Sequence, residues 1–188
     1  MKKVFFLTAV LASLAGAALH FLHDALPNVL TALISPVNES VWEHLKLLYW
    51  PMLLSGFFLS RRAGKEARRR LEQIGEYSET AAALTVVRER HRLWGGIFAA
   101  ELIMPVFLLG VYYLLQRWFG GTGLAVDVLL YFAAMALGYA AAYGLYRSGR
   151  AEAAAPWLLL PVVFYGAALV LFTFAAPGLP IFQPPMGG

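Results

Sequence analysis

The sequence predicts an all-α protein: a polytopic membrane helical bundle of about five transmembrane helices, forming a single domain over residues 1–188. Hydrophobic residues make up 60% of the chain and charged residues only 14%, whereas soluble domains carry roughly 25% charged residues. Four apolar runs each approach the roughly 20 residues that cross a bilayer core as helix. These runs are residues 4–22, 94–115, 124–146 and 157–175. There is no cysteine, which excludes disulfides and thiolate metal sites.

The first run also has features of a secretory signal peptide, because Lys2 and Lys3 precede it and small residues follow. Its apolar part is longer than the usual core of a signal peptide, and the polar residue His20 comes next. We therefore interpret residues 4–22 as a retained transmembrane helix.

The distribution of Lys and Arg predicts the topology. Nearly all of these residues lie in three clusters: before the first run, between residues 60 and 93, and just after residue 146. The positive-inside rule places all three clusters in the cytoplasm. That arrangement requires a fifth span, residues 41–59, with the N-terminus inside and the tail, residues 176–188, outside. We expect a multi-pass protein of the cell inner or plasma membrane.

Two connecting segments are expected at the membrane surfaces. Residues 60–93 mix basic residues with glutamates in a helix-favouring sequence, which predicts a cytoplasmic helical loop on anionic lipid head groups. Membrane lipids are thus the expected partners. Residues 61–93 of the same loop are also a candidate contact surface for a second copy of the chain or for another membrane or cytosolic protein. Because the basic residues lie beside transmembrane spans, they are not taken as evidence of nucleic-acid binding. Residues 24–34 are apolar but too short to span, which predicts an outer interfacial or re-entrant segment.

The run SPVNESVWEHLKLLYWP, residues 35–51, places polar groups at the start of the fifth span. Its apolar continuation, residues 47–59, covers only roughly 20 Å at about 1.5 Å per residue, less than the roughly 30 Å of the hydrocarbon core. Glu43, His44 and Lys46 are therefore expected inside the outer part of the membrane, facing the protein interior. A capping box that starts at Ser40, together with a Glu43–Lys46 ion pair, explains most of the run without any ligand.

Polar groups from other spans are predicted at the same depth. His20 ends the first span, and Asp127 lies one turn into the span at 124–146 from the outer side. The predicted polar pocket consists of His20, Asn38, Glu39, Ser40, Trp42, Glu43, His44, Lys46 and Asp127.

Part of this pocket suits a metal ion. A zinc-like divalent cofactor is the candidate for His20, Glu43, His44 and Asp127, because imidazole and carboxylate are suitable ligands. The H-E-x-x-H pattern of metalloproteases is absent. An ion-pair network explains the same residues and is the preferred interpretation if Lys46 points into the cluster, because its ammonium would repel a second cation.

One further acidic residue, Glu101, lies within the apolar run 94–115. An intramembrane carboxylate is a functional candidate by default. The preferred interpretation is structural: a protonated carboxyl hydrogen-bonded between helices, or one that reaches a basic residue at the inner surface.

The segment PVNESVWEHLKL, residues 36–47, resembles the signature of an uncharacterised family of small prokaryotic multi-pass membrane proteins. The similarity extends to HF at 20–21, VD at 126–127 and LFTFAAPGLPIFQPP at 171–185. The resemblance implies a membrane helical bundle and no particular activity. Two features depart from the family pattern: His23 replaces an expected aromatic residue, and the basic segment 61–93 is longer.

Three function classes are compatible with these features. The preferred one is a non-catalytic membrane subunit that binds a partner or small ligand. The first alternative is a membrane-embedded metal-assisted hydrolase. The second is a small-solute or proton transporter, for which five spans without a visible inverted repeat are few.

Overall fold

The computed structural model describes residues 1–73 and 78–184, and every regular element within those ranges is a helix. In chain order these are α1 (Lys2–Leu19), α2 (Leu22–Ala25), α3 (Val29–Ile34), α4 (Val41–His44), α5 (Lys46–Gln73), α6 (Glu79–Phe119), α7 (Leu124–Ser148), α8 (Ala155–Phe174) and the 3₁₀ helix η1 (Pro180–Phe182).

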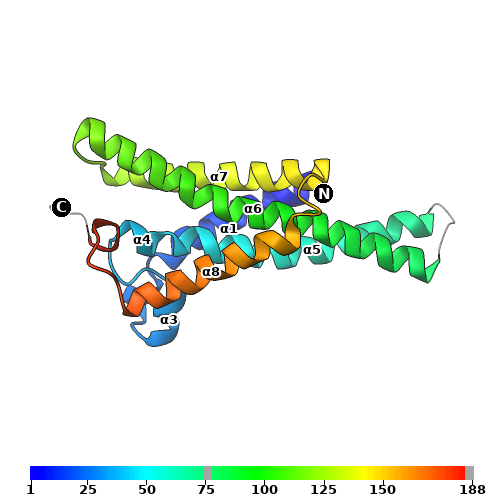
Figure 1. The fold of residues 1–188 in the computed structure, drawn as a ribbon, viewed down its shortest axis with the longest axis horizontal. Helices are drawn as coiled ribbons and strands as arrows, with labels where there is room; N and C mark the ends of the chain where they lie inside the picture. Colours follow the sequence, from blue (N-terminus) through cyan, green and yellow to red (C-terminus); the bar gives the residue numbers. More distant parts are fainter. Residues whose placement is uncertain (74–77, 185–188) are drawn as a thin grey trace.

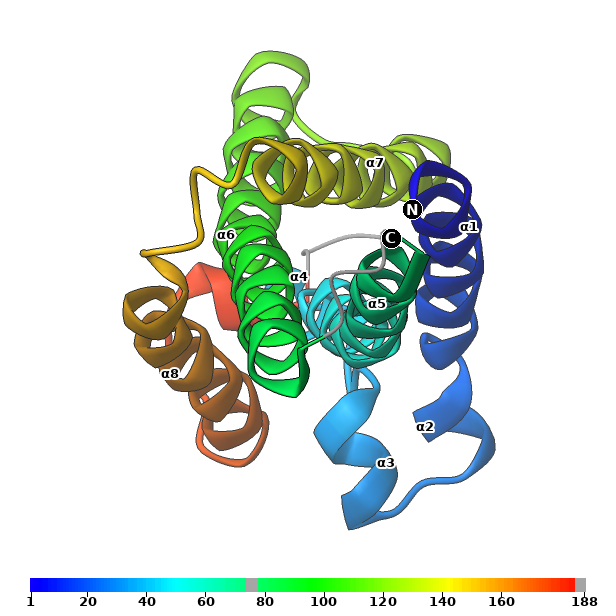
Figure 2. The ribbon, with the colours of Figure 1, turned by 90° about the vertical axis from the view of Figure 1, so that its right-hand side faces the viewer.

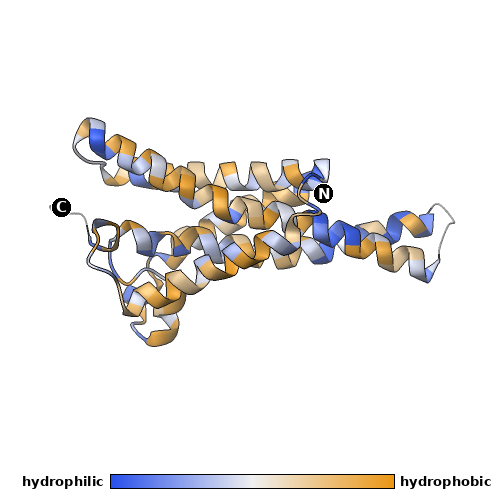
Figure 3. Cartoon of the chain, in the orientation of Figure 1, coloured by the Kyte–Doolittle hydropathy of each residue, from blue (hydrophilic) through white to orange (hydrophobic). Residues whose placement is uncertain are grey.

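The five long helices form an elongated bundle (Figure 1). Helix α6 packs against α5, α7 and α8, and α1 packs against α5 and α7, an arrangement visible along the bundle axis (Figure 2). We call the end that carries α2, α3, α4 and η1 the cap end. The opposite end, formed by residues 61–73 of α5 and residues 79–92 of α6, is the basic end. Hydrophilic residues gather at the basic end, while the middle of the bundle is largely hydrophobic (Figure 3).

Within residues 1–73 and 78–184, four helices are long and apolar enough to cross a membrane: α1, α6, α7 and α8. They correspond to the four apolar runs that the sequence marks as spans, although α1 ends at Leu19, before the end of the run 4–22, and α8 ends at Phe174. Large apolar side chains point away from the bundle along these helices; Phe6 on α1 is 73% exposed and Phe164 on α8 is 72% exposed. A water-soluble protein rarely exposes so much apolar surface in one region, so this surface is of the kind that lipid covers.

The predicted span 41–59 differs from the other four. It comprises two helices, α4 and the first half of α5, and α5 is not among the helices that are long and apolar enough to cross a membrane. At Leu45 the backbone stays helical, but bonds of the tighter 3₁₀ kind link Leu45 N to the Trp42 carbonyl (3.1 Å) and Leu48 N to the Leu45 carbonyl (3.2 Å). The chain therefore continues in nearly the same direction into the centre of the bundle, where Leu48 and Met52 are fully buried.

Small residues let the central helices approach closely. A Cβ on Gly96 of α6 would lie 2.6 Å from the carbonyl oxygen of Ala142 on α7, so only glycine fits there. Ala134, Gly138 and Ala142 recur every four residues on α7 and are buried against α6 and its neighbours. This contact fixes α7, and with it the start of α7 at the cap end.

The segments outside the apolar runs are mostly helical as well. Within the predicted loop 60–93, α5 continues to Gln73 and α6 begins at Glu79; residues 74–77 lie outside the described part of the chain. The predicted interfacial segment 24–34 contains the end of α2 and all of α3. In the tail, the ring of Phe182 packs 5.0 Å from that of Trp42, so residues 180–182 cover α4.

Candidate functional site

The cap end begins with a short hairpin of α2 and α3 that is held by local hydrogen bonds. Asn28 caps α3, its side chain accepting from the amides of Leu30 and Thr31, and the Thr31 hydroxyl accepts from the Asn28 amide in return. The Ser35 hydroxyl then donates to the carbonyl of Leu19 at 2.6 Å, which ties the end of α3 to the end of α1. The backbone carbonyls at the C-terminus of α3 are thus fixed in position above α5.

Those carbonyls receive a buried lysine. Lys46 Nζ donates to the carbonyl oxygens of Ala32 (2.8 Å) and Ser35 (3.3 Å) and to Glu43 Oε2 (2.6 Å), and its side chain is fully buried. Lys46 follows Glu43 by three residues across the α4–α5 junction, so the two side chains meet on one helix face. Carbonyls at a helix C-terminus carry partial negative charge and suit a cation.

Both carboxylate oxygens of Glu43 also accept hydrogen bonds. Its Oε2 atom accepts from the amide of Val37 at 3.0 Å, and its Oε1 atom accepts from the hydroxyl of Thr173 on α8 at 3.1 Å. Glu43 is 2% exposed. This cluster, which we call the buried ion pair, therefore links α3, the segment before α4, α5 and α8 in one hydrogen-bonded network. Both charged groups use their hydrogen-bonding capacity within the protein, as buried ions require.

A second cluster, which we call the histidine cluster, lies beside the buried ion pair and is partly open to solvent. Nε2 of His44 lies 3.5 Å from Glu39 Oε2, and Nε2 of His20 lies 4.0 Å from Glu39 Oε1. One potential ligand atom from each of these three residues lies within 4.8 Å of the others. The two imidazole rings are 5.0 Å apart, centroid to centroid. His20 and His44 are half-buried, whereas the Glu39 side chain is 68% exposed.

The hydrogen bond on the far side of His44 fixes its tautomer. Nδ1 of His44 lies 2.8 Å from the carbonyl oxygen of Ser40. A carbonyl only accepts, so Nδ1 must carry the proton. In the neutral imidazole, the lone pair is then on Nε2, the atom that faces Glu39. A backbone carbonyl on the opposite nitrogen is a common support for a metal-binding histidine.

His20 and Asp127 both lie toward the cap end, but no hydrogen bond joins them in the described part of the chain. The Tyr131 hydroxyl of α7 donates to the carbonyl of Ser13 at 2.8 Å, and α1 and α7 run in opposite directions (Figure 1). Four residues further toward the cap end on α7 is Asp127, and α1 ends beside His20. Nδ1 of His20 and Oδ1 of Asp127 are both buried atoms without a hydrogen-bond partner among residues 1–73 and 78–184.

The other predicted pocket residues support the fold of this region. Asn38 Oδ1 accepts from the Ser40 amide at 2.8 Å, and Ser40 caps α4 by accepting from the Glu43 amide at 3.3 Å. Trp42 packs against the rings of Phe172 and Phe182. These residues shape the turn between α3 and α4 and seal it against α8 and η1.

The predicted set of four metal ligands does not come together as one group. Glu43 is held in the buried ion pair, and Asp127 is not among the three residues whose ligand atoms converge. The carboxylate that joins the two histidines is instead Glu39, which belongs to the predicted pocket but not to the four predicted ligands. Glu39 precedes the N-cap of α4, and its backbone is outside the helix. No helical period therefore sets the direction of its side chain.

The comparison with family models identifies the family. A model described as a family of unknown function, DUF6512, matches residues 1–73 and 80–188. The chain belongs to this family. No curated protein and no solved structure matches it. Membership in DUF6512 thus covers nearly the whole chain and leaves its activity open, so a function has to be inferred from the geometry of the cap end.

Glu101, the remaining candidate in this DUF6512 member, lies in the middle of α6, apart from the cap end. It is fully buried, and neither carboxylate oxygen has a hydrogen-bond partner among the described residues. The helix interior supplies no free backbone donors at this position, because each amide bonds to the carbonyl four residues before it. The predicted hydrogen bond between helices is therefore not formed in this structure.

Proposed function

We propose that this chain is a multi-pass integral membrane protein that binds a divalent, zinc-like metal ion at its outer face through His20, Glu39 and His44. We assign it the role of a non-catalytic membrane subunit whose small ligand is this ion. The observation that carries the proposal is the convergence of one ligand atom from each residue within 4.8 Å.

The membrane arrangement in this proposal has five spans. The four apolar helices supply four, and α4 with the first half of α5 supplies the fifth, because α5 runs through the centre of the bundle beside them. Hydrophilic residues gather at the end opposite to the histidine cluster (Figure 3), and the sequence there is rich in Arg and Lys. The positive-inside rule then orients the basic end toward the cytoplasm and the cap end outward.

This orientation is testable by labelling, because the chain contains no cysteine. In intact cells, a membrane-impermeant thiol reagent should label Gly121→Cys, in the α6–α7 connection, but not Ser78→Cys, at the start of α6. A Cβ added at Gly121 would meet no neighbouring atom within 4 Å, so the change is sterically free. Labelling of Ser78→Cys from outside would refute the orientation.

The distances within the histidine cluster fit a metal after a small contraction. Zinc binds nitrogen and oxygen at about 2.0–2.2 Å, so neighbouring ligands of a tetrahedral ion are roughly 3.3 Å apart. The His44–Glu39 distance of 3.5 Å is already close to that, and the His20–Glu39 distance of 4.0 Å is slightly longer. Glu39 is exposed and free to rotate, so it is the ligand that would move. Two imidazoles and one carboxylate are a donor set that zinc prefers. Lys46 does point inward, as the ion-pair interpretation requires, but Glu43 compensates its charge at 2.6 Å, and the proposed site uses a different carboxylate, Glu39.

Two groups support the ligands from behind. The Ser40 carbonyl holds His44 with Nε2 directed at Glu39. Nδ1 of His20 is buried and has no partner among the described residues, and Asp127 of α7, also without a partner at Oδ1, is the carboxylate that we propose accepts a hydrogen bond from it when Nε2 binds the ion. Carboxylates that support a metal-binding histidine in this way typically contribute 10–100-fold in metal affinity.

A metal-assisted hydrolase is the second candidate, because three protein ligands leave a fourth position open, the arrangement of catalytic zinc sites. A bound ion there would lower the pKa of a coordinated water. Against this, Glu43, the carboxylate in the adjacent buried ion pair, already binds Lys46, Val37 and Thr173 and is not free to act as a base. The non-catalytic role is therefore preferred.

Metal analysis of the purified protein tests the proposal. After loading with zinc and removal of free ion, we expect one zinc per chain in the wild type and none in His20→Ala or His44→Ala. Asp127→Asn should retain zinc with an affinity lower by about 10–100-fold. The matched control is His23→Ala, because the His23 ring hydrogen-bonds Thr31 at 3.0 Å and lies outside the cluster.

Three outcomes are decisive against the site. Wild-type protein that holds no zinc would refute it, as would full zinc retention in the His20→Ala, His44→Ala double variant. Equal zinc loss in His23→Ala would show that the effect is not specific to the three ligands.

A further inference from the structure

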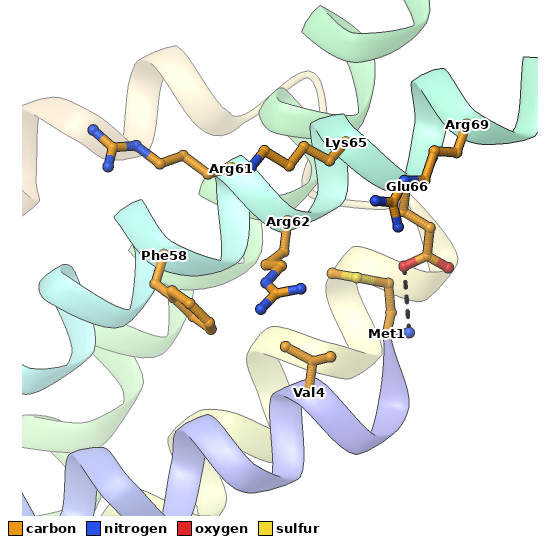
Figure 4. A pocket seen from close by; sticks show the side chains of 8 residues that line it. All are labelled: Met1, Val4, Phe58, Arg61, Arg62, Lys65, Glu66 and Arg69. Carbon is orange, nitrogen blue, oxygen red and sulfur yellow. Dashed lines mark hydrogen bonds and ion pairs between the residues drawn. The ribbon is translucent and has the colours of Figure 1, made fainter. Parts of the chain in front are cut away.

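A cavity of about 490 Å³ lies between α1 and α5 at the basic end (Figure 4). Its lining combines basic and apolar side chains: Met1, Val4, Phe58, Arg61, Arg62, Lys65, Glu66 and Arg69. This site is at the opposite end of the bundle from the histidine cluster. We call it the basic cavity.

The basic cavity carries an excess of positive charge that the described residues do not neutralise. Arg61, Arg62, Lys65 and Arg69 have no carboxylate partner in the part of the chain that the structure describes. Arg62 extends from α5 toward α1 (Figure 4), and its guanidinium lies 5.5 Å from the centre of the Phe58 ring. The cavity therefore presents several donors to an anion.

The single acid of the cavity, Glu66, is already engaged. Its Oε1 atom accepts from Arg70 at 2.6 Å, and its Oε2 atom is 3.5 Å from the amino group of Met1. Burial raises the pKa of the Glu66 carboxyl, but the hydrogen bond and charge of Arg70 and the Met1 ammonium lower it more, so the net pKa is below its ordinary value. Glu66 thus stays ionised and paired, and it does not neutralise the four other cations.

Apolar surface adjoins the charged groups on the side of the bundle middle. Val4 and Phe58 line the cavity itself. Further toward the bundle middle on the same helix faces, Leu7 and Leu11 of α1 and Leu54 of α5 are exposed by 59%, 58% and 66%. An occupant that satisfies both surfaces needs an anionic head and an apolar chain.

We propose that the basic cavity binds an anionic phospholipid, with its phosphate held by Arg62, Lys65 and Arg69 and its acyl chains lying along Leu54, Leu7 and Leu11. Guanidinium groups form bidentate hydrogen bonds with phosphate oxygens, and basic pockets between membrane helices on the cytoplasmic side are typical lipid sites. This inference rests on the membrane placement proposed above and is independent of the metal site.

Lipid binding to the purified full-length protein tests the proposal. The detergent-solubilised chain is titrated with phosphatidylglycerol and, separately, with phosphatidylcholine of identical acyl chains, and bound lipid is counted by native mass spectrometry. We expect retention of one phosphatidylglycerol in preference to phosphatidylcholine. Arg62→Gln and Lys65→Gln should each weaken phosphatidylglycerol binding about fivefold, and Arg62→Lys should weaken it less. The matched control is Arg147→Gln, a basic residue at the same end that does not line the cavity.

The outcomes separate lipid from other ligands and from the metal proposal. Equal affinity for the two lipids, or wild-type affinity in both Arg62→Gln and Lys65→Gln, would overturn the assignment. Displacement of phosphatidylglycerol by excess inorganic phosphate alone would also overturn it, because the acyl chains would then contribute nothing. If Arg62→Gln fails to fold, Lys65→Gln decides the question by itself. Zinc content is unaffected by any of these variants, so a failure here leaves the histidine cluster untouched.

Discussion

Replacement of Lys46 by methionine should strongly destabilise the protein. The two side chains have similar length and shape, so the change leaves little cavity and mainly removes the charge. Three acceptors lose their donor: Glu43 Oε2 at 2.6 Å and the carbonyl oxygens of Ala32 and Ser35 at 2.8 and 3.3 Å. The Glu43 carboxylate keeps only the Val37 amide and the Thr173 hydroxyl.

The size of the effect follows from the burial of the pair. Both side chains are at most 3% exposed, so water does not replace the lost ammonium. Removing one partner of a buried ion pair typically costs about 3–5 kcal/mol, because an uncompensated charge stays in the interior. We expect Lys46→Met to lower the free energy of unfolding by about that amount. The double variant Glu43→Gln, Lys46→Met should be less destabilised than Lys46→Met, because it leaves no buried charge.

Denaturant unfolding in detergent micelles, followed by helical circular dichroism, measures these differences. Lys65→Met is the control, because it makes the same substitution on the same helix at an exposed position. A Lys46→Met variant within about 1 kcal/mol of both the wild type and Lys65→Met would refute the reasoning. A double variant less stable than Lys46→Met would show that Glu43 matters through contacts other than its charge.

Three further predictions concern the rest of the bundle. Glu101→Gln should leave the midpoint of thermal unfolding unchanged or raise it, because a buried carboxyl without a partner gains nothing from charge; a large fall would reveal a partner that binds the carboxylate. Gly96→Val should lower the unfolding free energy by about 1–3 kcal/mol, since the added Cβ would press on the Ala142 carbonyl; wild-type stability in the same assay would argue against close α6–α7 packing. The hydrogen bond from Arg92 lowers the pKa of Glu152 below its ordinary value of 4.5, although burial opposes this. The ionised Glu152 carboxylate therefore stabilises the folded state above pH 4.5, and this contribution is lost as the pH falls through the lower pKa of the folded state. The difference in unfolding midpoint between wild type and Glu152→Gln should accordingly be seen at neutral pH and shrink in acid; a difference that grows in acid would contradict the sign.

The parts of this structure that the sequence predicts well are those that depend on neighbours along the chain. The four apolar runs become α1, α6, α7 and α8, because length and hydropathy are properties of a continuous segment. The helix start at Ser40 follows from its cap, which involves only residues within one turn. The meeting of Glu43 and Lys46 follows from their spacing of three residues on a helix face.

The composition of the cap end depends instead on contacts between segments that are distant along the chain. The hairpin of α2 and α3 folds back so that carbonyls of Ala32 and Ser35 reach Lys46, and the crossing of α8 brings Thr173 to Glu43. Sequence patterns predict a bundle of apolar helices with polar residues gathered at the start of the span 41–59. They do not show which of those residues join the buried ion pair and which join the histidine cluster. Packing of the helices closes Glu43 into an ion pair, and it turns Glu39 toward the two histidines, because Glu39 lies in a turn where no helical period sets its direction.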